Sequence, residues 1–168
     1  MDKTYFNKIV ENIEKVNELQ SENILKAASL MADAIEQDRL INVYGGGGHT
    51  TLPVGEMFFR AGGLANVSPM LDTDLMLHNG AAKSSRMEKM SGIAGEVFRR
   101  YTPSEKDMIF IFSASGKNQV PIEMAKEAKK SGVKSVGVSS LAYAGKGGIL
   151  HENVDIAIDC KVPYGDAC

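Results

Sequence analysis

Two short stretches of the sequence combine small, polar and glycine residues in a way that suits anion binding. The first contains Ser113, Ser115, Gly116 and Asn118, directly after the most strand-like run in the chain and before a helix-like segment that begins near Pro121. A helix N-terminus presents unpaired N–H groups and a partial positive charge, and proline is tolerated in its first turn. The stretch therefore favours phosphate binding, although ordinary helix capping uses the same residue types.

The second stretch is a run of four glycines, residues 45–48, followed by His49 and Thr50. Glycines such as Gly47 and Gly48 allow positive φ and a close approach of the backbone, so their N–H groups can face an anion. The spacing matches neither the phosphate loop of nucleotide triphosphatases nor the dinucleotide-binding glycine motif. A flexible tight turn is the alternative interpretation.

The elements around these stretches alternate between β-type runs and helix-length segments. The β-type runs cover 40–44, 108–112, 134–138 and 155–158, with a weaker one at 66–68, and the helical segments cover 52–61, 86–101 and 121–131. The alternation predicts right-handed βαβ crossovers and a three-layer α/β/α fold with a flavodoxin-like parallel sheet of about five strands. Ligands of such sheets bind outside the carboxyl ends of the strands, where both polar stretches would lie.

The beginning of the chain predicts helices only. Apolar residues recur at helical spacing from Phe6 to Leu19, Ser21 offers an N-cap, and a second apolar stripe runs from Ile24 to Ile35. We expect an N-terminal helical hairpin (1–39) before an α/β core (40–168), both within one domain. Residues 1–40 hold five Lys and Arg against eight Asp and Glu, which argues against contact with nucleic acid.

The composition excludes several classes of protein. The 168 residues are 43% hydrophobic and 24% charged with a net charge of −2, which is typical of a globular chain and offers no bulk positive charge to nucleic acid or a membrane surface. There is no apolar run near the ~18 residues of a membrane span, and the N-terminus lacks a signal peptide pattern, so we expect a cytoplasmic protein. The two cysteines, Cys160 and Cys168, lack paired zinc-ligand partners, and we expect neither a metal nor a cofactor.

The motifs resemble the sugar isomerase (SIS) domain family. The stretch from Ser113 to Asn118 is similar to the phosphosugar loop of that family. Residues 46–50, 56–63, 77–78, 83–85, 121–125 and 162–167 resemble its bacterial branch of phosphosugar and phosphoheptose isomerases. The resemblance runs nearly end to end. Two features depart from it: the run of four glycines, and the end at Cys168, because relatives continue further. We therefore expect a C-terminus truncated relative to the family.

The resemblance implies roles for several residues. Ser113 and Ser115 would hold the sugar phosphate, Asn118 stands where the family usually has a hydroxyl, Thr50 would supply the hydroxyl of the first loop, and Ser139 would line the sugar. Related domains also pair so that one subunit completes the site of the other. We therefore expect a homodimer or a higher homo-oligomer.

Glu56 and His49 are the candidates for acid–base catalysis. Glu56 matches the glutamate that acts as base in some phosphoheptose isomerases, and His49, at the start of the same predicted helix, could polarise or protonate a sugar oxygen. Seven residues of helix separate them by roughly 10 Å, so they could flank a sugar but not share one proton. A solvated glutamate and a helix-capping histidine are the alternatives.

The resemblance and the residues together predict a protein that binds a phosphorylated sugar and catalyses its aldose–ketose isomerisation by proton transfer. Two alternatives remain open: a sugar-phosphate sensor without catalytic activity, and a sugar-phosphate lyase or etherase on the same fold.

Overall fold

A parallel five-stranded sheet forms the centre of the computed structural model, which describes residues 3–144 and 149–165. The strand order is β2-β1-β3-β4-β5, and every neighbouring pair is parallel. The strands are β1 (Ile41–Gly45), β2 (Val67–Met70), β3 (Met108–Phe112), β4 (Lys134–Ser139) and β5 (Ile156–Asp159). All five lie at or beside the predicted β-type runs, and the predicted α/β fold with a flavodoxin-like sheet is confirmed.

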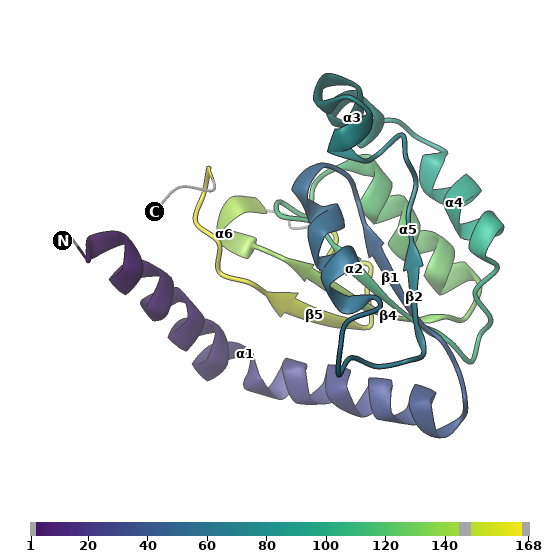
Figure 1. The fold of residues 1–168 in the computed structure, drawn as a ribbon, viewed down its shortest axis with the longest axis horizontal. Coiled ribbons are helices and arrows are strands. Elements are labelled where there is room, and N and C mark those ends of the chain that lie inside the picture. Colours follow the sequence, from purple (N-terminus) through teal and green to yellow (C-terminus); the bar gives the residue numbers. More distant parts are fainter. Residues whose placement is uncertain (1–2, 145–148, 166–168) are drawn as a thin grey trace.

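Helices cover both faces of the sheet (Figure 1). On one face α4 (Ile93–Tyr101) packs against α5 (Gln119–Lys130), and on the other lie α1 (Thr4–Glu36) and α2 (Thr51–Met57). The remaining described elements are short: α3 (Ala81–Met87), α6 (Leu141–Ala144) and the 3-10 turns η1 (Gly48–Thr50) and η2 (Leu77–Asn79). Every helix within the described ranges is too short or too polar to cross a membrane.

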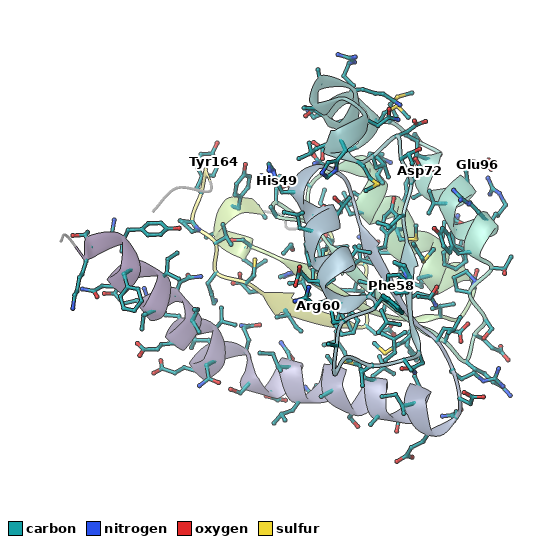
Figure 2. The ribbon with its side chains drawn as sticks, in the orientation of Figure 1. His49, Phe58, Arg60, Asp72, Glu96 and Tyr164 are labelled. Carbon is teal, nitrogen blue, oxygen red and sulfur yellow. The ribbon has the colours of Figure 1, made fainter. Side chains whose placement is uncertain are left out.

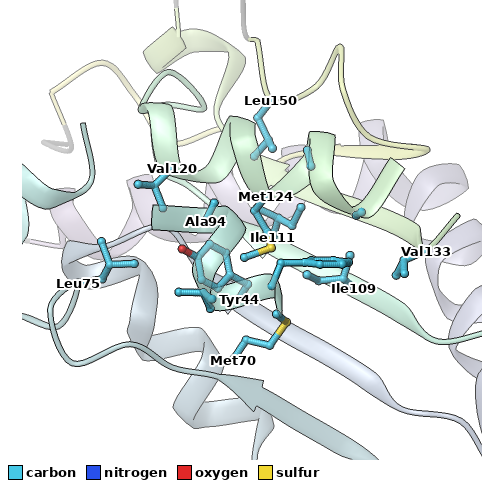
Figure 3. Close-up of a cluster of buried hydrophobic side chains, with 14 residues drawn as sticks. Tyr44, Met70, Leu75, Ala94, Ile109, Ile111, Val120, Met124, Val133 and Leu150 are labelled. Atoms are coloured by element: carbon cyan, nitrogen blue, oxygen red, sulfur yellow. The ribbon is translucent and has the colours of Figure 1, made fainter. Parts of the chain in front are cut away.

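The pleat of β3 divides the core into two layers, because successive side chains of a strand point to opposite faces. Ile109 and Ile111 join the layer under α4 and α5, together with Tyr44 and Met124 (Figure 3). Phe110 joins the layer under α1 and α2. Both faces of the central strands are therefore buried, which fixes the carboxyl ends of β1 and β3 rigidly.

The predicted N-terminal hairpin is wrong, since residues 4–36 form one helix of 33 residues. Neither glycine nor proline interrupts this segment, and most of its residues are good helix formers. Ser21, predicted to cap a second helix, lies inside the helix, and its hydroxyl donates to the Asn17 carbonyl one turn earlier. Because this hydroxyl is already hydrogen-bonded within the helix, it does not act as the cap of a second helix.

Helix α1 also covers the edge strand β5. The Asn23 side chain donates to the Ala157 carbonyl at 2.9 Å, the Asp159 N–H donates to the Gln20 side chain at 3.0 Å, and the Asn12 side chain donates to the Cys160 carbonyl at 3.4 Å. These bonds satisfy backbone groups that an open sheet edge would expose. The N-terminal end of α1 continues past the sheet (Figure 1).

The helix predicted over 86–101 is two helices in the structure. Helix α3 ends at Met87 and α4 begins at Ile93, after Gly92, whose φ of +90° breaks the helical path. The predicted helix 52–61 is shorter than expected, because Phe58 takes an extended conformation after α2 ends at Met57.

Candidate functional site

The two polar loops begin at paired positions of neighbouring strands. They are the glycine loop, residues 46–50 after β1, and the serine loop, residues 113–118 after β3. Gly45 of β1 lies in register with Phe112 of β3, and the Gly46 N–H donates to the Phe112 carbonyl at 3.1 Å. The chain leaves β1 toward β2 on one side of the sheet and leaves β3 toward β4 on the other. Loops that diverge at such a switch point leave a crevice between them, which is the usual ligand site of open α/β sheets.

A cavity of about 310 Å³ occupies this crevice. It is lined by Gly46, Gly47, Gly48, His49, Thr50, Leu77, Ser85, Glu88, Ser113, Ala114, Ser115, Asn118 and Tyr143. The volume is at the lower end of the range for small-molecule sites. The fold therefore brings together the glycine loop and the serine loop, which are more than sixty positions apart in the sequence.

The serine loop is held in shape by bonds to its own backbone. The Gly116 N–H donates to the Ser113 hydroxyl oxygen at 3.1 Å, and the Lys117 N–H donates to the Ser115 hydroxyl oxygen at 3.3 Å. Each hydroxyl keeps its own hydrogen to donate to a ligand oxygen. Asn118 has an extended backbone directly before α5 and makes no side-chain bond to the helix N-terminus. The loop therefore presents hydroxyl donors to the cavity beside the positive end of a helix of 12 residues.

The glycine loop is fixed by hydroxyl groups on both sides. The Thr50 hydroxyl donates to the Gly47 carbonyl at 2.5 Å. The Gly48 N–H donates to the hydroxyl oxygen of Ser84 at 3.2 Å, and this buried hydroxyl donates to the Leu75 carbonyl at 2.7 Å. Ser84 therefore supports the loop from α3, and no local signal in the sequence indicates that role.

The SIS domain profile matches residues 4–140, a range that includes both loops. The chain belongs to the SIS domain family. It is 41% identical to a UPF0309 protein of Thermoanaerobacter pseudethanolicus and 36% identical to one of Geobacillus kaustophilus. The two alignments each cover 97% of this chain, and 69% and 67% of the two relatives.

Two solved structures have the same fold as this SIS domain. Phosphoheptose isomerase GmhA from Neisseria gonorrhoeae superposes with a TM-score of 0.72 at 17% identity, over 96% of this chain and 84% of that chain. A phosphoheptose isomerase from Francisella tularensis superposes with a TM-score of 0.70 at 16% identity, over 98% of this chain and 84% of that chain. The resemblance found in the sequence motifs is confirmed.

The two predicted catalytic residues lie in different places in the SIS domain. His49 lies in η1 and lines the cavity, whereas Glu56 lies in the last turn of α2 and does not. The Glu56 side chain is 69% exposed and pairs with Arg60 at 3.6 Å. Figure 2 shows His49 and Arg60 at opposite ends of α2. Because α2 leads away from the carboxyl ends of the strands, its last turn lies outside the cavity, and a catalytic role for Glu56 stays a prediction.

Neither Ser139 nor Gly116 lines the cavity: Ser139 lies behind the serine loop, and Gly116 is the residue of that loop that faces it. Ser139 is buried at the end of β4, and a Cβ on Gly116 would lie 2.9 Å from its hydroxyl oxygen. Gly116 has a φ of +66°, a conformation that glycine adopts without strain. Ser139 therefore packs beneath the loop at Gly116, and a direct contact between Ser139 and a sugar stays a prediction.

Glu88 lines the cavity, although no motif in the sequence predicts a functional role for it. It follows α3, and its half-buried carboxyl group lies against the glycine loop, since a Cβ on Gly47 would lie 3.1 Å from Glu88 Oε2. Burial raises the pKa of Glu88 above its ordinary value, while the charge of Lys89 and a hydrogen bond with Asn118 act in the opposite direction. Only the tertiary fold brings position 88 between the two loops.

The charged groups of the cavity are few. Of its described lining residues, only His49 can become positively charged, and only Glu88 is a carboxylate. Within the described ranges no three His, Cys, Asp or Glu side chains gather in a way that could hold a metal ion. An anion in this cavity would therefore be held by hydroxyl and N–H groups rather than by a cluster of basic side chains.

Proposed function

We propose that this SIS domain binds a phosphorylated sugar in the cavity and catalyses its aldose–ketose isomerisation by proton transfer. The observation that carries the proposal is the serine loop: Ser113 and Ser115 line the cavity directly before the N-terminus of α5. Hydroxyl donors and the positive end of a helix are a common phosphate site. The family membership and the fold shared with two phosphoheptose isomerases support the same class of ligand.

The rest of the cavity fits the remainder of such a ligand. With the phosphate on the serine loop, the sugar would extend toward the glycine loop, with His49, Thr50 and Tyr143 within the same walls. These side chains can exchange hydrogen bonds with sugar hydroxyls. His49 can also pass a proton between two oxygens, because the two ring nitrogens of a neutral imidazole are one donor and one acceptor.

Calorimetric titration with pentose, hexose and heptose phosphates tests this proposal. A lost hydrogen bond to a charged group costs about 1.5–3 kcal/mol, so Ser115→Ala should weaken binding roughly 10- to 150-fold. Ser131→Ala makes the same change at the exposed far end of α5 and serves as the matched control, with unchanged affinity expected.

The outcomes separate the candidate functions. Equal affinity in wild type and Ser115→Ala, or no binding of any sugar phosphate, would refute the phosphate site. NMR spectra of the mixtures report the reaction: interconversion of an aldose and a ketose supports isomerisation, an eliminated fragment indicates a lyase or etherase, and binding without a new species indicates a sensor.

A further inference from the structure

The side chain of Glu88 is not needed to hold this part of the chain against the start of α5. The backbone of Glu88 already serves the fold, since its carbonyl accepts the Val120 N–H of α5 at 3.2 Å. The side chain instead lies in the cavity wall, against Gly47 on one side and bonded to Asn118 on the other. It therefore stands between the two loops that would enclose a bound sugar phosphate.

The surroundings of Glu88 suit a group that takes up and releases a proton. A carboxyl that is partly removed from water holds its proton more tightly than one in solvent, and a proton-transfer group works best when its pKa is near the working pH. Burial acts in this direction on Glu88. A bound phosphate would act in the same direction, because a second negative charge disfavours ionisation. The described titratable groups around the carboxyl are Lys89 beside it and His49 and Tyr143 across the cavity.

We propose that Glu88, rather than Glu56, is the residue that transfers the carbon-bound proton in this cavity. The inference rests on the proposed isomerisation. Glu56 is 69% exposed, is paired with Arg60 and lies outside the cavity walls, whereas Glu88 forms part of them. Of the described lining residues it alone offers a carboxylate, the kind of base that removes a proton next to a carbonyl.

The reaction balances with this residue and His49 alone. Ionised Glu88 takes the proton from the carbon beside the carbonyl, and the electron pair of that C–H bond forms a carbon–carbon double bond. The carbonyl π electrons move to its oxygen and give an enediolate. His49 passes the proton of the neighbouring hydroxyl to that oxygen. Glu88 then returns its proton to the former carbonyl carbon, and the neighbouring oxygen becomes the new carbonyl, so no oxidant or reductant is needed.

The test follows exchange of the C1 or C2 proton of a bound sugar phosphate with deuterated water by NMR, alongside calorimetric affinity. General-base catalysis contributes about 10²–10⁴ in rate, so Glu88→Gln should lose that much exchange. Its affinity for the sugar phosphate should be equal or higher, because the amide keeps an acceptor for Asn118 and removes a negative charge. Glu96→Gln, the same change at an exposed residue of α4, is the matched control with wild-type exchange.

Each outcome separates this inference from the proposed function. Wild-type exchange in Glu88→Gln, or a large loss in Glu56→Gln instead, would overturn the assignment while isomerisation stands. The pH profile adds a readout that a merely structural role would not move: exchange by wild type should rise with pH through the raised pKa of Glu88, and Glu88→Gln should lack that limb. Binding without exchange in wild type would overturn both the isomerisation and this inference, and no binding at all would refute the phosphate site itself.

Discussion

Replacing Gly116 with alanine tests whether the serine loop is closed against the sheet, as the structure has it. Gly116 has a φ of +66°, and an added Cβ would lie 2.9 Å from the Ser139 hydroxyl oxygen, 3.3 Å from Ser139 Cβ and 3.4 Å from Leu150 Cβ. Gly62 offers a matched control, because its φ is +76° and an added Cβ would meet nothing within 4 Å. The two substitutions share the backbone strain and differ in the space available.

The expected losses of stability follow from the backbone strain and from the space available for the added methyl group. A left-handed conformation costs an alanine about 1–2 kcal/mol, so Gly62→Ala should lower the free energy of unfolding by that amount. Gly116→Ala adds the cost of overpacking, typically about 1–3 kcal/mol, for a total of about 2–5 kcal/mol. The restriction of the unfolded chain by alanine is the same in both variants and cancels in the comparison. The difference between the two variants is therefore about 1–3 kcal/mol.

Urea denaturation followed by circular dichroism measures both free energies of unfolding. For a chain of this size, a difference of about 1–3 kcal/mol corresponds to roughly 2–12 °C in melting temperature. Gly116→Ala should also bind sugar phosphates more weakly, since the loop must shift to admit the methyl group, whereas Gly62→Ala should not. Equal destabilisation of the two variants would refute the close contact between the serine loop and Ser139.

Three further predictions concern assembly and pH. The apolar stripe of α1 that includes Phe6 and Ile13, 65% and 63% exposed, should bury itself in a homo-oligomer; analytical ultracentrifugation should show at least a dimer that Phe6→Ser with Ile13→Ser dissociates, and a monomeric wild type would contradict this. Because the folded state raises the pKa of Glu88, its ionised form opposes folding at neutral pH; Glu88→Gln should melt higher than wild type at pH 7, with the gain fading as the pH falls toward about 4. Burial alone would raise the pKa of Asp159, but hydrogen bonds from Lys161 and Leu141 lower it. Asp159→Asn should therefore lower the free energy of unfolding by about 1–3 kcal/mol at pH 7. In thermal melts the two melting temperatures should converge as the pH falls below about 3.9 through the lowered pKa.

The sequence alone predicted the sheet and the two loops, because the signals for both are local. The run 108–112 is apolar throughout, and a strand buried on both faces has that composition wherever it occurs. The serine and glycine loops follow two such runs, and the carboxyl ends of parallel strands meet at one edge. The meeting of His49, Thr50, Ser113, Ser115 and Asn118 in one cavity follows from that rule once the strand order is known.

Helix boundaries were less well predicted, since they depend on weak competing preferences. Ser21 suits a helix cap as well as an exposed position within a helix. Hydrogen bonds that join β5 to Gln20 before it and to Asn23 after it favour one continuous helix. The break between α3 and α4 rests on the positive φ of Gly92, which a glycine permits but does not require.

The tertiary structure determines which side chains line the cavity. The direction of α2 takes Glu56 away from the serine loop even though it follows the glycine loop closely in sequence. Glu88 is remote in sequence from both loops. A hydrogen bond from the Val120 N–H of α5 holds its backbone beside the cavity, and its carboxyl group lies between the two loops, partly withdrawn from water. The shift in its pKa arises from that burial, and burial is a property of the packed fold that the type of a residue and its neighbours along the chain do not contain.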